Sequence, residues 1–474
     1  MGHNSPPNVI LVVCDTLGAK HMSLYGYGRQ TTPCLERITE SEGFAVYQRC
    51  LSPASWTIPS HVSFFTGLYP DEHNVGDEHV SLPDNIYCLA EILKCLEYKT
   101  FGVTSNGLVS GLLNFHRGFD EFHEMWHFFN SKDFFEINRV FSESKRSVKG
   151  ELGRLLLLLR LSASHRDYAF LLKKFLNTAY KKVNGIDAIT HRSARATLRT
   201  IDTAKKILHS QGAHNPFFLF MNIMETHNQY NPPSGFDAFE KISSQTKDEA
   251  LKKYDWHHYA SSPLSAETFE VLNLLYDREV LFLDSVLEEF YSFLKRKKIL
   301  DNTLLIITSD HGELLGEHGQ YNHVFTLYNE LLHVPLLVKF PKDFGLSGQR
   351  NGLVQLHDIF ATVTDAAGSP LPVPDSSHSL LSSTPRKTAH AQLLNCDRPL
   401  RKYRQKNPSL VLRDFMQPHA SLITDDMMKI TKRADGHTEI YDLNQDLYET
   451  RNLSNDPTYA EKKQELLRLF EEPR

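Results

Sequence analysis

Apolar residues along this chain form short unbroken runs, and long stretches compatible with helix separate the runs. Four of them are rich in β-branched or aromatic residues: 9–13, 100–104, 216–223 and 303–308. Runs of this kind are typical of central parallel strands, because such strands are buried on both faces. Strands that alternate with helices predict an α/β fold, a layered sheet with helices on both faces.

The C-terminal part has a different pattern. A Pro/Ser-rich stretch at 369–385 is the expected linker, and short strands are predicted at 422–424 and 437–441. An amphipathic helix is predicted from Tyr459 onward. We therefore expect a catalytic domain at 1–370 and a small C-terminal α+β subdomain at 371–474.

One segment, about 122–206, has the composition of an almost wholly helical insertion. Its middle, 150–182, carries leucine-rich faces flanked by lysine and arginine. One interpretation is a set of helices that pack on the main domain. The other is a lid or a peripheral membrane contact. The richest apolar run, 155–159, is far too short to span a bilayer, which takes roughly 20 residues.

Composition narrows the choice of partner and compartment. The chain has 474 residues, 41% of them apolar, and a net charge of -5, so nothing suggests a nucleic-acid partner. Its six cysteines form no CxxC pair, which favours reduced thiols. No signal peptide precedes the first predicted strand, and we expect a cytoplasmic protein. Nothing in the sequence indicates an oligomeric state.

Polar residues follow three of the four predicted strands. Asp15 follows the first, Glu225 and His227 the third, and Asp310 and His311 the fourth. In α/β sheets the working residues gather in loops just past the carboxyl ends of the strands. These side chains are therefore expected to converge.

The Asp310-His311-Gly312 segment is the strongest of these motifs. A carboxylate beside an imidazole at a strand end can bind one divalent cation, and glycine lets the loop turn tightly. The alternative for such a dipeptide is a turn or a helix cap. For Asp15, likewise, the alternative is a helix N-cap.

Thr57 lies two residues before a proline and just before Ser60-His61, at a predicted helix start. The unpaired N–H groups and the dipole of a helix N-terminus favour an anionic group, which suits a nucleophile that attacks an anionic ester. The alternative is an ordinary capped helix with Pro59 in its first turn.

Together these motifs resemble the sulfatase branch of the alkaline phosphatase superfamily. The segments that carry the resemblance, in chain order, are 8–18, 57–70, 117–120, 224–232, 276–313, 357–362 and 441–453. The resemblance implies a central mixed, mostly parallel sheet flanked by helices, with a small C-terminal α+β subdomain. It also implies a divalent cation (Mn, Ca, Mg or Zn) held by Asp15, Thr57, Asp310 and His311.

The chain departs from the family pattern at positions that bear on the reaction. Thr57 occupies the place of the formylglycine cysteine, and His61 the place of the arginine in the same signature. Thr16 replaces the second metal aspartate, the segment 104–107 replaces a lysine region, and His323 stands where a later lysine is expected. Threonine cannot expel sulfate by collapsing to an aldehyde, whereas it can attack phosphorus.

We therefore predict a metal-dependent hydrolase or phosphoryl transferase of phosphate esters, most of all phosphodiesters of small or lipid-like molecules. Thr57 is the predicted nucleophile, and His227, His323 or His61 the predicted proton donor or oxyanion contact. One metal ion is favoured; a second would use His227 and His323 with Glu225. Two alternatives stay open. The first is a sulfuric ester hydrolase that uses Thr57 without formylglycine, and the second is a catalytically inert binding protein with this fold.

Overall fold

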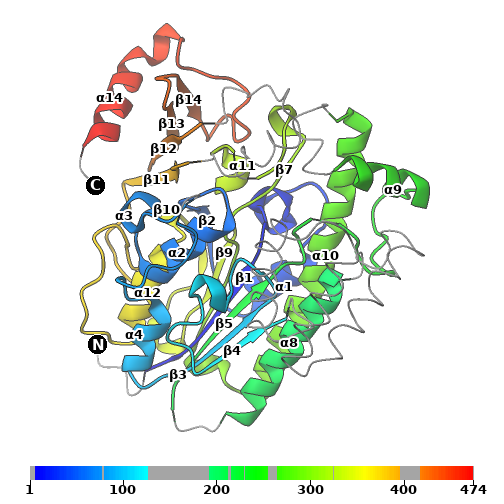
Figure 1. The fold of residues 1–474 in the computed structure, drawn as a ribbon, viewed down its shortest axis with the longest axis vertical. Helices are drawn as coiled ribbons and strands as arrows, with labels where there is room; N and C mark the ends of the chain where they lie inside the picture. The colour runs from blue at the N-terminus through cyan, green and yellow to red at the C-terminus, as the bar shows by residue number, and fades with distance from the viewer. Residues whose placement is uncertain are drawn as a thin grey trace, which may run out of the picture.

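A computed structural model describes residues 6–76, 79–125, 192–211, 215–228, 230–254, 264–323, 325–395 and 417–472. Its main feature is an eight-stranded sheet of order β10-β2-β9-β6-β1-β5-β3-β4 (Figure 1). The strands are β1 (Asn8–Cys14), β2 (Ala45–Leu51), β3 (Lys99–Thr104), β4 (Glu121–Glu124), β5 (Phe217–Ile223), β6 (Thr303–Thr308), β9 (Leu336–Lys339) and β10 (Gly348–Gln355). Only β9 runs antiparallel to its neighbours. The predicted α/β fold with a mixed, mostly parallel sheet is confirmed.

Helices cover both faces of this sheet (Figure 1). Alternate residues of β1 point to opposite faces, so Ile10 and Val12 pack in one apolar cluster and Val9 and Leu11 in another. The first cluster includes residues of α1 (Pro33–Ser41), α8 (Arg192–Ser210) and α10 (Ala266–Lys297). The second includes residues of α2 (Thr57–Thr66), α4 (Leu89–Cys95) and α12 (Asp358–Ala366). Burial on both faces explains why β1 is apolar throughout.

The strand order places the chemistry-bearing loops together. β1 lies between β5 and β6, and its Val13 pairs with Asn222 on one side and Thr308 on the other. All three strands are parallel, so their carboxyl ends meet at one edge of the sheet. The loops that follow these strands therefore start side by side.

A second sheet forms the C-terminal part, drawn in orange and red at the top of Figure 1. Its antiparallel strands are β11 (Thr388–Leu393), β12 (His419–Thr424), β13 (Met428–Arg433) and β14 (Thr438–Asp442). Helix α14 (Ala460–Glu471) buries Leu466 against Leu422 and Ile430 of this sheet. The strands and the helix match those expected near 422–424, 437–441 and 459, whereas the domain boundary at 370 remains a prediction.

A buried ion pair ties this sheet to the catalytic part. Lys429 of β13 donates to the Leu327 carbonyl and lies 2.6 Å from Glu449 Oε1. The same Glu449 oxygen accepts from the Asn329 amide at 2.9 Å. Both charged side chains are only 1% exposed. These residues, 327–329 with Lys429 and Glu449, form what we call the junction clasp.

The segment 122–206, predicted to be almost wholly helical, is described by the structure only at its two ends, and the first of these is a strand. Residues 121–124 form strand β4, which pairs with β3, so the expectation of helix from Phe122 is wrong at its start. Its end is helical, since α8 begins at Arg192. Residues 126–191, with the leucine-rich segment 150–182, lie outside the described residues. In the part of the chain described here, no helix combines the length and apolar character that a bilayer crossing requires.

Candidate active site

Asp15, Asp310 and His311 meet at the shared edge of β1 and β6. Each offers one ligand atom, and these three atoms lie within 4.8 Å of one another. All three residues are fully buried. Among the described residues they are the only group of three or more His, Cys, Asp or Glu side chains that could hold a metal ion.

The Asp310 carboxylate is oriented by the backbone. Its Oδ1 accepts from the amides of Thr16 at 3.1 Å and of His311 at 3.0 Å. Its Oδ2 is buried and accepts no hydrogen bond from the residues described. It faces two imidazole nitrogens, His311 Nε2 at 3.4 Å and His61 Nδ1 at 3.5 Å. Two backbone amides thus fix one oxygen and leave the other for a ligand.

Asp15 repeats this arrangement with a side chain as donor. Asn106 Nδ2 donates to Asp15 Oδ2 at 2.6 Å, while Asp15 Oδ1 is buried and has no hydrogen-bond partner among the described residues. The Asn106 amide is held in turn, because its Oδ1 accepts from the Leu108 amide at 2.7 Å. A buried polar atom without a partner is costly, so two such oxygens in one cluster are typical of a cation site.

His311 presents a lone pair to the same place. Its Nδ1 lies 2.9 Å from the Gly312 carbonyl, which only accepts, so Nδ1 carries the proton and Nε2 the lone pair. Nε2 lies 3.4 Å from Thr57 Oγ1. Gly312 is required at the next position, because a Cβ there would lie 2.1 Å from the Glu330 carbonyl oxygen. Two carboxylate oxygens and one imidazole nitrogen are a normal ligand set for a divalent cation.

The electrostatics of the cluster also suit a cation. Burial raises the pKa of Asp310 to about 7, and burial followed by repulsion from Asp310 raises the pKa of Asp15. Burial, together with the neighbouring His323, lowers the pKa of His311 to about 3. A bound cation would favour the ionised form of both carboxylates. The neutral His311 imidazole could bind the same cation through its lone pair. The residues present therefore fit a divalent cation.

Thr57 is the first residue of α2, as the sequence predicted, and is 2% exposed. Its hydroxyl faces His311, while its carbonyl accepts a hydrogen bond from His61 Nδ1 at 2.9 Å. The other nitrogen of His61, Nε2, accepts from Asn222 Nδ2 at 3.1 Å. Burial lowers the pKa of His61 to about 3. Because both ring nitrogens are engaged, His61 orients Thr57 and has no proton to offer a leaving group.

His323 and His227 lie next to His311. The ring centroid of His323 lies 4.5 Å from that of His311 and 5.4 Å from that of His227. Nδ1 of His323 donates to Glu313 Oε1 at 3.0 Å. The structure thus brings both predicted histidines to the site.

Glu225 does not join them. Its carboxyl is fully buried and meets the carboxyl of Glu279 on α10, and this contact raises the pKa of Glu279 after the effect of burial. The second-ion grouping of His227, His323 and Glu225 is therefore not formed among the described residues. The strand end predicts that a loop is near the site, but not which of its successive side chains faces the site.

Thr16 also turns away from the ligand atoms. Its hydroxyl lies 2.7 Å from the carbonyl oxygens of Asp15 and Thr226, and its φ of 60° is in the left-handed region. Its amide, rather than its side chain, serves the site by binding Asp310. The sequence placed Asn106 in the segment that replaces a lysine region but did not predict its contact with Asp15, and it gave no role to Asn222 or Glu313. Asn106 lies two residues after the end of β3, and Glu313 lies two residues after the proposed ligand His311. These spacings are the sequence feature that could have identified them.

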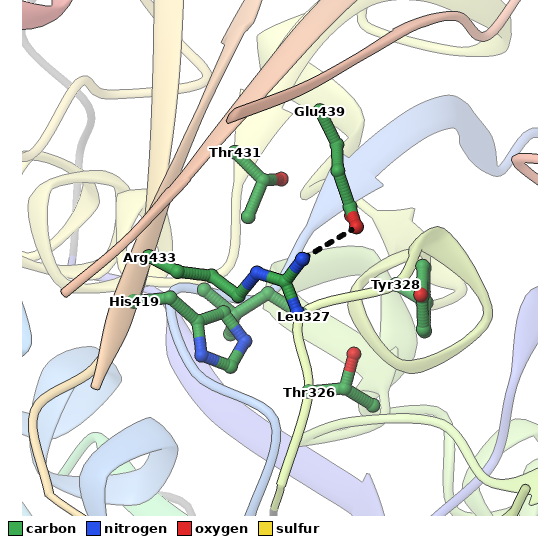
Figure 2. Close-up of a pocket in the computed structure, with 7 residues that line it drawn as sticks. All are labelled: Thr326, Leu327, Tyr328, His419, Thr431, Arg433 and Glu439. Carbon is green, nitrogen blue, oxygen red and sulfur yellow. Dashed lines mark hydrogen bonds and ion pairs between the residues drawn. The ribbon is translucent and has the colours of Figure 1, made fainter. Parts of the chain in front are cut away.

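A small hollow lies elsewhere, where the C-terminal sheet meets the segment before α11 (Asn329–Leu332). It is lined by Thr326, Leu327, Tyr328, His419, Thr431, Arg433 and Glu439 (Figure 2). Arg433 reaches across it toward Glu439, with Nη2 3.4 Å from Oε1. The hollow encloses about 20 Å³, the space of about one water molecule. It is a packing gap beside the junction clasp, too small for a substrate.

Comparison with known proteins agrees with the fold and the motifs. The family model "Sulfatase" matches residues 7–369, and the model "N-sulphoglucosamine sulphohydrolase, C-terminal" matches residues 316–474. Bovine arylsulfatase K is 27% identical over 333 residues, which cover 62% of this chain and only 58% of that protein. The N-acetylglucosamine-6-O-sulfatase of Bacteroides thetaiotaomicron is 22% identical over 98% of this chain and 86% of its own length.

Solved structures show the same fold at low identity. One is a protein in complex with its substrate D-glucosamine-2-N,6-O-disulfate, with a TM-score of 0.66, 18% identity, and coverage of 98% of this chain and 97% of the other. Another is a phosphonate monoester hydrolase of Agrobacterium radiobacter, with a TM-score of 0.68, 17% identity, and coverage of 98% and 94%.

These comparisons correct the predicted reaction. The curated relatives carry sulfatase names, so the prediction of a phosphodiesterase or phosphoryl transferase is wrong, and the sulfuric ester alternative fits better. The error has a physical source. Sulfate and phosphate esters are both tetrahedral oxyanions, so a hydroxyl beside a metal ligand set does not distinguish sulfur from phosphorus.

Proposed function

Because this chain belongs to the sulfatase family, we propose that it hydrolyses a sulfate monoester of a small molecule with Thr57 as the nucleophile. The observation that carries the proposal is the buried Asp15/Asp310/His311 cluster, with the Thr57 hydroxyl 3.4 Å from His311 Nε2. A hydroxyl at a helix N-terminus and beside a cation-binding set is placed to attack an anionic ester.

Asp15, Asp310, His311 and the Thr57 hydroxyl would hold a divalent cation. We favour Mn²⁺ or Zn²⁺ over Ca²⁺ and Mg²⁺, because one of the ligands is an imidazole. Such a cation, when bound, supplies positive charge that lowers the pKa of a hydroxyl and attracts an anionic ester. Asn106 and the Thr16 and His311 amides hold the two carboxylates in place for this purpose.

The reaction proceeds by two displacements at sulfur. Thr57 Oγ1 forms a bond to sulfur as its proton passes through water to the ring of His227 or His323, and the ester S–O bond breaks with its electron pair left on the alcohol oxygen. That oxygen takes a proton from His227 or His323. Water then attacks the sulfur of the threonine sulfate and releases hydrogen sulfate, which restores the Thr57 hydroxyl. The sum is a sulfate ester plus water giving an alcohol plus hydrogen sulfate.

The charges of the site suit a sulfate monoester. Its group carries one negative charge, whereas a phosphate monoester carries nearly two at neutral pH. Among the described residues, the groups that contact Asp15, Asp310 and His311 are amides, hydroxyls and imidazoles. The nearby Lys20 is paired with Glu317. Two carboxylates and one divalent cation sum to zero, so the described residues of this cluster leave no fixed surplus of positive charge for a dianion.

We propose a sulfated sugar as the substrate class. The support is that one relative is named an N-acetylglucosamine-6-O-sulfatase, and one similar structure holds a disulfated glucosamine. The C-terminal match to a sulphoglucosamine sulphohydrolase points the same way.

The test is turnover of 4-nitrophenyl sulfate and glucosamine-6-sulfate by the Mn²⁺-loaded protein, beside bis(4-nitrophenyl) phosphate. We expect sulfate release, with Thr57→Ala slower by about 10³-fold or more and Thr57→Ser much closer to wild type. A Thr57→Ala protein at wild-type rate would assign the attack to water. Absence of sulfate release from any sulfate ester would mean an inert binding protein.

A further inference from the structure

We propose that Glu313 is a positioning residue that fixes the ring of His323, so that the Nε2 edge of His323 serves the alcohol leaving group. This inference rests on the proposed function. Glu313 is fully buried, and His323 is 8% exposed. Their contact joins Nδ1 to Oε1 at 3.0 Å, and the ring of His323 lies 4.5 Å from that of His311 between centroids.

A hairpin sets this pair in register. Strands β7 (Leu314–Leu315) and β8 (Tyr321–Asn322) are antiparallel, and Leu314 pairs with Asn322. Glu313 immediately precedes β7 and His323 immediately follows β8, so the next step of the ladder brings these two residues opposite each other. Glu313 is also two residues past the ligand His311. The hairpin thus connects the Asp15/Asp310/His311 cluster to His323 through Glu313.

The second oxygen of Glu313 is held as well. Tyr230 donates to Glu313 Oε2 at 3.3 Å, and the Tyr230 hydroxyl lies 3.2 Å from that of Tyr254. Tyr230 and Tyr254 are both buried. A carboxylate held at both oxygens, by a tyrosine and by an imidazole, cannot rotate without breaking a buried hydrogen bond.

This contact sets the tautomer of His323. A carboxylate oxygen at Nδ1 accepts the Nδ1 proton, so any further proton on the ring is carried at Nε2, on the opposite edge. Nε2 takes up, through water, the proton that the Thr57 hydroxyl loses as it attacks sulfur. As the S–O bond breaks, its electron pair stays on the alcohol oxygen and this proton passes from Nε2 to that oxygen. The ring returns to its neutral form with the Nδ1 proton still on the Glu313 side. Glu313 itself touches neither sulfur nor the alcohol.

The chain contains a matched control for this pair. Glu330 is also buried, at 2% exposure, and its Oε1 lies 3.1 Å from His318 Nε2. It makes the same kind of contact with a histidine but belongs to no part of the proposed machinery. Substitutions at Glu330 therefore report what the loss of any buried glutamate–histidine contact does to the protein.

The first experiment compares two leaving groups in the full chain loaded with Mn²⁺. Phenyl sulfate needs a proton at its leaving oxygen far more than 4-nitrophenyl sulfate does. We expect Glu313→Leu to lower kcat for phenyl sulfate by about 10²-fold, with little change in KM and a much smaller loss on 4-nitrophenyl sulfate. Glu313→Gln, which keeps an acceptor for Nδ1–H, should restore most of the phenyl sulfate rate.

Glu330→Leu and Glu330→Gln should change the two substrates by the same factor. The proposal is overturned if Glu313→Leu lowers kcat equally for both substrates, or if Glu313→Gln is as slow as Glu313→Leu, because a purely structural glutamate would give these results.

A second measurement does not depend on turnover. In ¹⁵N-histidine-labelled protein, with His323→Gln to assign the resonance, wild-type His323 should carry its proton on Nδ1, and Glu313→Leu should shift it toward Nε2. A wild-type ring protonated on Nε2 alone would overturn the proposal. This measurement stands even if no sulfate ester is hydrolysed, so failure of the proposed function and failure of the positioning role are told apart.

Discussion

Replacing Asp310 by asparagine should have opposite effects on stability in the metal-free and the metal-bound protein. Asp310 and Asp15 are buried together, and burial raises the pKa of both. Without a cation the two carboxylates repel each other, so Asp310→Asn should leave the metal-free protein as stable as wild type or more stable at neutral pH. With a cation bound, the wild type should be more stable than Asp310→Asn. The reason is that Asp310 Oδ2, one of the two carboxylate oxygens without a hydrogen-bond partner among the described residues, is an expected ligand of the cation.

The size of the effect follows from mass action. A cation at about 100 times its Kd stabilises the folded state by about 2.7 kcal/mol. The entropy of unfolding is about 2.1 cal/mol/K per residue, or about 1 kcal/mol/K for 474 residues. The wild-type Tm should therefore rise by about 3 °C on adding Mn²⁺. If the substitution weakens binding by about 100-fold, the gain falls to about 0.4 kcal/mol and the shift to under about 1 °C.

The assay is calorimetry of chelator-treated protein with and without Mn²⁺, for wild type, Asp310→Asn and Asp301→Asn. Asp301 is exposed in the short turn before β6 and serves as the control. Asp301→Asn should show the full wild-type shift. An Asp310→Asn protein that kept the full shift, or that lost several degrees of Tm without metal, would refute the assignment of Asp310 as a ligand.

Three further predictions concern other parts of the molecule. Asn106→Leu should raise the Kd for Mn²⁺ by about 10- to 100-fold in calorimetric titration, because Asn106 orients Asp15, whereas Ser105→Ala should not. Lys429→Met should destabilise the protein by about 3–5 kcal/mol in urea unfolding, since it leaves Glu449 buried and unpaired, whereas Lys432→Met on the same strand should cost under about 1 kcal/mol. His357 is buried, and burial lowers its pKa from 6.5 to about 3, so the unfolded chain binds more protons as pH falls below 6.5 and stability is lost. His357→Gln should shrink the difference in unfolding free energy between about pH 7 and pH 5 by about 2 kcal/mol; an unchanged difference would contradict this.

The sequence predicts the centre of the fold better than its edges. The runs that became β1, β5 and β6 are apolar because both of their faces are covered, and that pattern needs no knowledge of neighbours. Strand β4 has four residues, and only its pairing with β3 makes it a strand. A window centred on Phe122 contains no trace of that partner, so local propensity could not have found it.

The candidate site shows the same limit at the level of single side chains. Asp15, Asp310 and His311 could be predicted to meet, because each follows a strand end and the strands are parallel. The side-chain directions in the irregular turns could not. Thr16 adopts a left-handed conformation that turns its hydroxyl away, and Glu225 faces Glu279 of α10 while His227, two positions on, faces His323. Such outcomes depend on what packs against the loop from distant parts of the chain.

The junction clasp has a consequence for the order in which the protein is made. The loop that follows His323 is fixed by Lys429 and Glu449, which lie 102 residues beyond Leu327 and 120 beyond Asn329. During synthesis the large sheet can form while these two residues are still to be translated. Until then the loop beside the site has neither the Lys429 ammonium group that binds the Leu327 carbonyl nor the Glu449 carboxylate that binds the Asn329 amide. The nascent chain therefore acquires an ordered site late, and substitutions in β13 that spare the site itself should lower the yield of active protein made by the ribosome.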